Sequence, residues 1–148
     1  MSYTVPSISD FQQYFARDFP FQPIGTPDLT LYIQDSDIQK GLDMALGWVN
    51  QALFSSQTDF TIGYELMSAH CMVMNLRASS LGLSGKFDWA TGSKSVGSVS
   101  ISQAIPAKIL DNPTYAWIAM SNYGVTYLTM VLPSMSGYVF AMQGATQA

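Results

Sequence analysis

The sequence predicts a mainly α protein: a small bundle of about four helices, with a long loop or β-hairpin insertion and an extended C-terminal tail. Apolar residues recur at helical spacing in several segments, a Gly- and Ser-rich segment interrupts them, and no charged residue follows Asp111. A chain of 148 residues fits one domain with a single core. We expect one domain over 1–148, with a helical body at about 7–80 and 112–132, an insertion at about 81–105 and a tail at about 133–148.

The first predicted helix begins close to residue 7. Ser7 or Ser9 is a suitable N-cap, because a serine hydroxyl can accept a hydrogen bond from a free backbone N–H of the first turn. Pro20 cannot continue a helix and should end this one. Aromatic residues three and four positions apart form one helical face. These residues are Phe11, Tyr14, Phe15 and Phe19.

Acidic residues mark the start of the second predicted helix. Asp35 and Asp37 suit the positive N-terminal end of a helix dipole. Ser36 and Gln39 have the spacing of a capping box. An apolar stripe then continues as far as Phe54. The stripe consists of Ile38, Leu42, Ala45, Leu46, Val49 and Leu53.

The third predicted helix, from about 60 to 79, is apolar almost all round and should be the most buried helix of the bundle. A short polar turn at 55–59 separates it from the second helix, so the two should pack antiparallel and form the core. Six residues of these helices are expected to be nearly buried. They are Leu42, Leu46, Val49, Leu66, Val73 and Leu76.

The next part of the chain is predicted to form an insertion that projects from the helical body. The segment 81–94 is typical of a long exposed loop, and 95–102 alternates like a single strand. This strand needs a partner, which is either the preceding loop or a neighbouring subunit. Two aromatic residues of the loop and two apolar residues of the strand are expected at an interface. They are Phe87, Trp89, Val99 and Ile101.

The last predicted helix begins with Asn112 as its N-cap and Pro113 in its first turn. Pro133 should end it. The tail that follows contains Gly137 and Gly144, which give its backbone freedom. Its apolar side chains are candidate anchors for a partner. They are Met135, Tyr138, Val139, Phe140 and Met142.

The sequence predicts no catalytic or metal site. His70 and Cys71 are single residues of their kinds. As neighbours on a helix they point about 100° apart and cannot form a nucleophile–base pair. A zinc site needs more such ligands, and Asp35, Asp37 and Asp43 lack the glycine of an EF-hand loop. We expect a structural role for His70, and neither a cofactor nor a metal.

The composition favours a subunit that a partner covers. Only 11% of the residues are charged, and the uncharged stretch after Asp111 is rich in aromatic residues and Met. The net charge of −4 and the scattered basic residues argue against a tight grip on nucleic acid. The uncharged stretch is too polar for a membrane span, so we expect no membrane role. The N-terminus lacks the pattern of a signal peptide.

Six stretches, covering almost the whole chain from about 11 to 140, carry a family resemblance. They are Phe15–Phe21, Asp37–Leu46, Tyr64–Leu76, Ser95–Ser102, Tyr123–Leu128 and Gly137–Phe140. In this order and spacing they resemble a family of small tailed-bacteriophage head–tail adaptor proteins, also called head-completion or connector proteins. The chain departs from the family in its last helix, where many relatives carry charged residues and this chain has none.

The resemblance implies a structural virion protein without enzymatic activity or cofactor. Such adaptors are helical bundles that form a homo-oligomeric ring, usually a dodecamer, beneath the portal protein. The ring extends the DNA channel without sequence-specific DNA binding and docks the next neck or tail protein. The chain would be made in the host cytoplasm and located in the virion neck. In this interpretation the tail from Pro133 docks on the portal, through Met135, Tyr138, Val139, Phe140 and Met142.

Two alternatives stay open at this point. One alternative is another ring component of the neck, such as a stopper or tail-terminator protein. Those proteins tend to be β-rich, so the predicted helix content counts against this alternative. The other alternative is a small enzyme or ligand-binding domain that uses the loop around Phe87 and Trp89 as a lid. A lone histidine and the lack of a recognisable carboxylate motif weigh against this second alternative.

Overall fold

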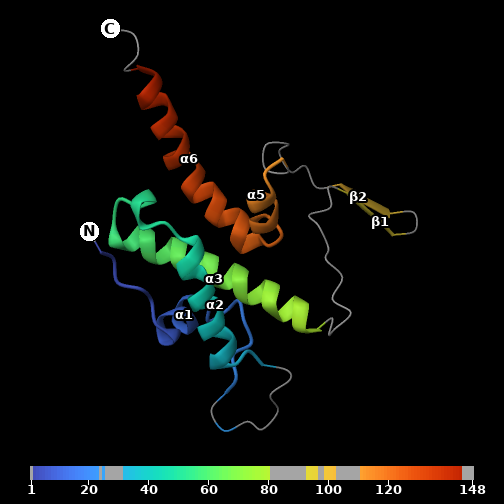
Figure 1. Cartoon of the computed structure of the whole chain (residues 1–148). Coiled ribbons are helices and arrows are strands. Elements are labelled where there is room, and N and C mark those ends of the chain that lie inside the picture. The colour runs from blue at the N-terminus through green and yellow to red at the C-terminus, as the bar shows by residue number, and fades with distance from the viewer. Residues whose placement is uncertain are drawn as a thin grey trace.

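A computed structural model describes residues 2–23, 25, 32–80, 93–96, 99–102 and 111–144, with the backbone alone at 80, 93–96, 99–102 and 136–144. The described chain is mainly α, as the sequence predicts (Figure 1). Its helices are α1 (Ile8–Tyr14), α2 (Asp35–Trp48), the short 3-10 helix η1 (Gln51–Leu53), α3 (Gln57–Ser80), α5 (Pro113–Ile118) and α6 (Asn122–Gly144).

Helix α3 lies at the centre of the fold, as predicted. Helices α2 and α6 pack against it, α1 packs against α2, and α5 packs against α6 (Figure 1). Every residue from Gly63 to Met72 is buried. A helix that is covered on several sides needs apolar residues all round, which is the pattern seen in its sequence.

Helices α2 and α3 approach closely at Gly41. A Cβ atom at this position would lie 2.7 Å from the backbone oxygen of Ser68 and 3.1 Å from Cβ of Met72, so only glycine fits. One turn before Ser68 in α3, the Tyr64 hydroxyl donates a 2.6 Å hydrogen bond to the backbone oxygen of Leu42. The two helices are therefore joined by close backbone packing and by a buried polar contact.

Helix α1 begins as predicted but ends earlier. The Ser7 hydroxyl accepts a hydrogen bond from the Asp10 N–H at 3.3 Å, and the Asp10 carboxylate accepts one from the Ser7 N–H at 2.8 Å. The predicted continuation to Phe19 is wrong, because the helix ends at Tyr14 with Phe15 as its C-cap. The turn that follows brings the rings of Phe15 and Phe19 within 5.4 and 5.3 Å of the Tyr123 ring on α6.

The boundaries of α2 also differ from the prediction. Its N-cap is Gln34, whose backbone N–H donates to the Asp37 carboxylate at 3.1 Å. Ser36 is already inside the helix, so the predicted capping box of Ser36 with Gln39 is wrong. The helix ends at Trp48, and the last part of the predicted stripe belongs to η1 and its flanking residues.

Helix α3 starts three residues before its predicted beginning. The Ser56 hydroxyl accepts a 3.1 Å hydrogen bond from the Asp59 N–H and donates one of 2.7 Å to the Asp59 carboxylate. Ser56 therefore caps a helix that begins at Gln57.

The predicted core is right at three positions, partly right at two and wrong at one. Leu42, Val49 and Leu66 are buried. Val73 and Leu76 are half-buried. The prediction for Leu46 is wrong, since 57% of this side chain is exposed. Leu46 lies beside the face that α2 turns toward α3, and it borders a surface pocket with Val5 and Pro6 of the N-terminal segment.

The single last helix of the prediction is two helices. Asn112 is the N-cap of α5, with its side-chain oxygen accepting from the Thr114 N–H at 2.9 Å, and Pro113 is the first helical residue, as predicted. The helix is then interrupted by a turn between Ile118 and Asn122, where α6 begins.

The prediction that Pro133 ends the last helix is wrong. Helix α6 continues through Pro133 to Gly144, so the expected extended tail is helical over this range. Pro133 and Thr129, the residue one turn before it, are both exposed. Proline has no backbone N–H to donate to the residue one turn before it. Because this position faces water, the proline is tolerated in the helix.

Two short strands accompany the helices. β1 (Ser93–Val96) and β2 (Val99–Ser102) pair antiparallel, with Lys94 opposite Ile101 and Val96 opposite Val99. The predicted single strand over 95–102 is wrong, because its two halves belong to different strands that pair with each other. The predicted loop at 81–92 lies outside the described residues.

Candidate interaction surface

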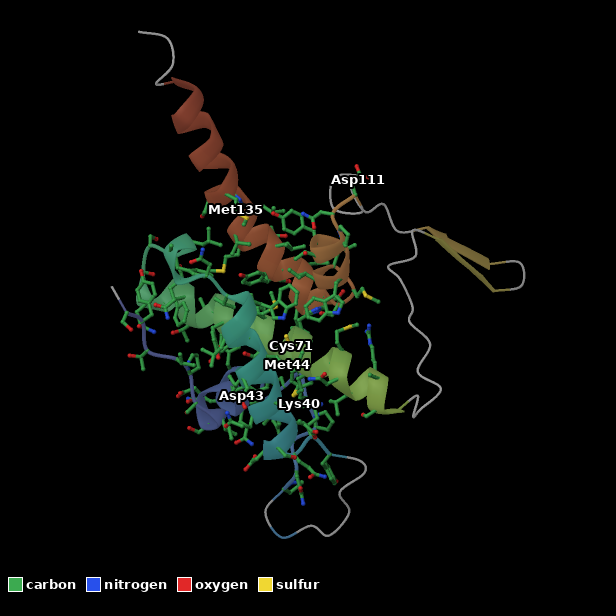
Figure 2. All side chains as sticks on the ribbon, viewed as in Figure 1. Lys40, Asp43, Met44, Cys71, Asp111 and Met135 are labelled. Carbon is green, nitrogen blue, oxygen red and sulfur yellow. The ribbon has the colours of Figure 1, made fainter. Side chains whose placement is uncertain are left out.

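Charged side chains are distributed unevenly over the bundle. Helices α5 and α6 carry none, and we call these two helices the uncharged layer. Helices α1, α2 and α3 form the charged layer. Figure 2 shows Lys40 and Asp43 on α2 and Met135 on α6, toward opposite sides of the bundle. The charged residues within α1, α2 and α3 are Asp10, Asp35, Asp37, Lys40, Asp43, Asp59, Glu65 and Arg77.

The outer face of α6 exposes small and uncharged residues. The Thr126 and Thr129 hydroxyls each donate a 2.9 Å hydrogen bond to a backbone oxygen one turn earlier in the helix. These hydroxyls are thus engaged by the helix itself. This exposed stripe of α6 is well suited to contact another protein, because few of its polar groups would lose hydrogen bonds to water. It consists of Asn122, Val125, Thr126, Thr129 and Pro133.

Two contacts of aromatic side chains involve the uncharged layer, one with α2 and one between α5 and α6. The rings of Trp48 and Trp117 stack with their centroids 4.8 Å apart, and Trp48 is exposed. The Tyr115 hydroxyl of α5 lies 3.7 Å from the Met135 sulfur of α6. Exposed tryptophan and methionine are enriched in protein–protein interfaces relative to other surfaces.

The uncharged layer is anchored on α3 through the turn between α5 and α6. Ser121 is buried, and its hydroxyl lies 2.7 Å from Nδ1 of His70. The same hydroxyl accepts a 3.1 Å hydrogen bond from the Gly124 N–H and so caps α6. A second contact joins the Arg77 guanidinium to the backbone oxygen of Met120 at 3.0 Å. Two polar contacts from α3 thus fix the start of α6.

Gly124 makes this anchoring sterically possible. A Cβ atom at this position would collide with the backbone oxygen of Ile118 and lie 2.9 Å from Nδ1 of His70. No other residue fits without moving the turn. The start of α6 is therefore closely packed against Ile118 of α5 and His70 of α3.

The pair of Ser121 and His70 has the composition of a nucleophile and base, but its surroundings are structural. Both side chains are buried, and His70 also meets the Trp117 ring edge to face at 4.4 Å. Burial lowers the pKa of His70 to about 4, so the imidazole is neutral at pH 7. The Ser121 hydroxyl is occupied as a helix cap. Through these contacts His70 joins α3 to Trp117 of α5 and to the turn before α6.

Cys71, the residue after His70, is the other reactive side chain that the sequence singles out on α3. Cys71 is fully buried, and burial raises the pKa of its thiol to about 11.

Within the described parts of the chain, no group of three or more His, Cys, Asp or Glu side chains is placed to hold a metal ion. Among those same residues, no helix combines the length and apolar character needed to cross a membrane.

The residues predicted to contact partners are only partly described. Met135 lies on α6 and is 37% exposed. Tyr138, Val139, Phe140 and Met142 belong to the same helix, but their side chains lie outside the described part of the structure. Phe87 and Trp89 lie outside it altogether. Val99 and Ile101 belong to β2, again with undescribed side chains.

No protein-family model matches the chain. No curated protein matches its sequence.

Proposed function

We propose that this chain is a structural subunit of a homo-oligomeric assembly, in which the uncharged layer is the interaction surface. The observation that carries the proposal is helix α6. Its C-terminal half extends beyond the bundle (Figure 1), and the helix has no charged residue along its whole length. A lone helix with an uncharged surface is poorly suited to bulk water and well suited to a protein groove.

The resemblance to head–tail adaptors supports a specific form of this proposal. The assembly would be a ring, with the chain placed beneath the portal of a tailed-bacteriophage virion. There it would extend the DNA channel and dock the next neck or tail protein. A net charge of −4 with few basic residues suits a conduit, because clustered cations would hold the DNA backbone.

The helical state of the C-terminal segment changes how portal docking would work. On a helix, positions 135, 138, 139 and 142 fall on one face, because they are spaced by three, four and seven residues. We therefore propose that Met135, Tyr138, Val139 and Met142 enter a crevice as a helical face. Repetition around a ring would strengthen a weak individual contact through avidity.

The segment 81–105 completes the proposal. We propose that it forms the loop or β-hairpin insertion of the fold and projects toward the channel or an adjacent subunit. The pairing of β1 with β2 supports a hairpin at its end. Phe87, Trp89, Val99 and Ile101 would supply its apolar contacts.

Deletion of residues 134–148 tests the docking proposal. The truncated chain should keep its fold, because the buried residues of α6 end at Val131 among those described. Native mass spectrometry of each chain, alone and mixed with the portal protein of the same phage, should show a multi-subunit complex for the full chain only. Normal docking by the truncated chain would place the portal contact elsewhere.

A matched control separates docking from folding. Circular dichroism of the truncated chain should show the loss of one helical segment and otherwise an unchanged, cooperative unfolding transition. A truncated chain that no longer unfolds cooperatively would mean that 134–148 belongs to the body of the fold, which contradicts its assignment as a docking element.

A further inference from the structure

A pocket on the charged layer has a composition that the proposed function does not explain. It lies between α1 and the first half of α3 and has a volume of about 700 Å³. No residue of α5 or α6 lines it, so it is separate from the uncharged layer. The lining side chains that matter for its chemistry are Asp10, Gln13 and Tyr14 from α1 and Thr61 and Glu65 from α3.

Glu65 is the unusual member of this pocket. Only 2% of the residue is exposed, although it lies at the border of the pocket. Its Oε2 atom is buried and has no hydrogen-bond partner. A buried carboxyl oxygen without a partner is costly, since water no longer solvates it and nothing replaces the water. Such an atom is satisfied when a donor binds in the pocket.

The electrostatic surroundings of Glu65 favour a cationic donor. No basic side chain is among the residues that line the pocket. The Asp10 carboxylate is held by the Ser7 N–H and hydroxyl at 2.8 and 2.6 Å, and these bonds lower its pKa, so it stays negative. Burial and the nearby Asp10 charge raise the pKa of Glu65 to about 7. A bound cation would oppose this rise, because it stabilises the ionised carboxylate.

Tyr14 supplies the third part of the site. It lines the same pocket and is 49% exposed, so its ring is accessible from solvent. Burial raises the pKa of its hydroxyl, and the charges of Glu65 and Asp18 raise it further. The hydroxyl is therefore neutral at pH 7, and the ring can stack against a planar cation.

We infer that this pocket binds the guanidinium group of an arginine side chain from a partner protein, between the carboxylates of Asp10 and Glu65 and against the Tyr14 ring. A guanidinium is planar and forks two N–H donors toward a carboxylate, whereas an ammonium is a compact point charge. The carboxylates of Asp10 and Glu65 can accept hydrogen bonds from the N–H groups of a guanidinium, and the Tyr14 ring can stack on its flat face. The volume leaves room for the partner's backbone beside the side chain.

The experiment uses the full chain and a blocked arginine, N-acetyl-arginine methylamide, as the probe. Carbon NMR of the Glu65 carboxyl gives its titration midpoint with and without probe. Saturating probe should lower that midpoint by about one pH unit or more, as expected for an opposite charge in contact. The apparent affinity should fall about tenfold for each pH unit below the pKa of Glu65. An unchanged midpoint would overturn the inference, whatever the behaviour of any variant.

Two other probes identify the source of the cation. Free arginine carries an α-carboxylate that Asp10 and Glu65 repel, so it should bind more weakly than the blocked form. Preferred binding of free arginine would indicate a small-molecule site and overturn the assignment to a protein partner. Blocked lysine should bind more weakly than blocked arginine. Equal binding of the two would overturn the choice of a guanidinium.

Variants then locate the site. Glu65→Gln should weaken probe binding at least about tenfold and remove its pH dependence, because the charge-assisted bond is lost. Asp43→Asn, on α2 outside this pocket, should leave binding unchanged. Equal affinity in Glu65→Gln and the parent chain would show that the probe binds elsewhere. Because no residue of α6 takes part, these results are independent of portal docking.

Discussion

Glu65 and His70 are buried on different sides of α3, and their surroundings differ. Glu65 faces α1 in the charged layer and borders an open pocket, with one carboxyl oxygen unpartnered. His70 faces the uncharged layer, where Nδ1 lies 2.7 Å from the Ser121 hydroxyl; its Nε2 atom also lacks a hydrogen-bond partner, but His70 lines neither the pocket beside Leu46 nor the pocket beside Glu65. The comparison suggests that the charged layer retains an open polar site, whereas the uncharged layer is fixed to α3 and offers its outer surface to a partner.

The largest expected effect concerns the core that both layers share. Replacing Leu66 by Ala should lower the free energy of unfolding by roughly 2–5 kcal/mol, because it leaves a cavity in the centre of the bundle. Leu46→Ala, on the exposed side of α2, should cost less than about 0.5 kcal/mol. Urea unfolding measures both. Similar losses for the two variants would mean that α2 packs with a different face.

The two titratable residues should give the stability of the protein opposite pH dependences. Burial lowers the pKa of His70 from 6.5 to about 4, so its stabilising contribution is complete above about pH 6.5 and is lost as the pH falls toward 4. Burial raises the pKa of Glu65 from 4.5 to about 7, so its contribution is complete below about pH 4.5 and is lost as the pH rises toward 7.

Single variants should separate these contributions. Glu65→Gln leaves the histidine effect, so the free energy of unfolding should rise between pH 4 and 6.5, by at most about 3 kcal/mol. His70→Asn leaves the glutamate effect, so the free energy should fall between pH 4.5 and 7 by a similar amount. Urea titrations at several pH values check the slopes. Parallel slopes in the two variants would contradict the proposed difference between the two sides of α3.

The attachment of the uncharged layer should depend on Gly124. Gly124→Ala places a methyl group against the backbone of Ile118 and should cost about 1–3 kcal/mol. Gly47→Ala is the matched control, since a Cβ at that position of α2 meets nothing within 4 Å. It should stabilise the chain by up to about 1 kcal/mol through higher helix propensity. Thermal unfolding of both variants measures these changes and tests whether the turn between α5 and α6 is tightly packed.

The sequence predicts the mainly α class and the order of the major helices, because apolar spacing and end-capping residues are local signals. Ser7 and Asn112 cap helices where their side-chain chemistry predicts. Glu65 carries a signal that the prediction did not use, since it is a lone carboxylate in an otherwise apolar stretch of helix.

The errors come from interactions that only the folded chain contains. The turn between α5 and α6 is joined to α3 by the contact between His70 and Ser121, residues that are 51 positions apart. Whether Pro133 ends a helix depends on which face water reaches. Leu46 continues the apolar spacing of α2 but lies beside α3 rather than against it.

The central claim is that the outer face of α6 is an interface between protein chains. Thr129→Lys adds a charge to this exposed face, with an expected change in unfolding free energy within about 0.5 kcal/mol. Gln39→Lys adds the same charge to an exposed position of α2. Native mass spectrometry, with and without portal protein, should show homo-oligomers of the parent chain and of Gln39→Lys, and none of Thr129→Lys. Undiminished assembly of Thr129→Lys would contradict the claim.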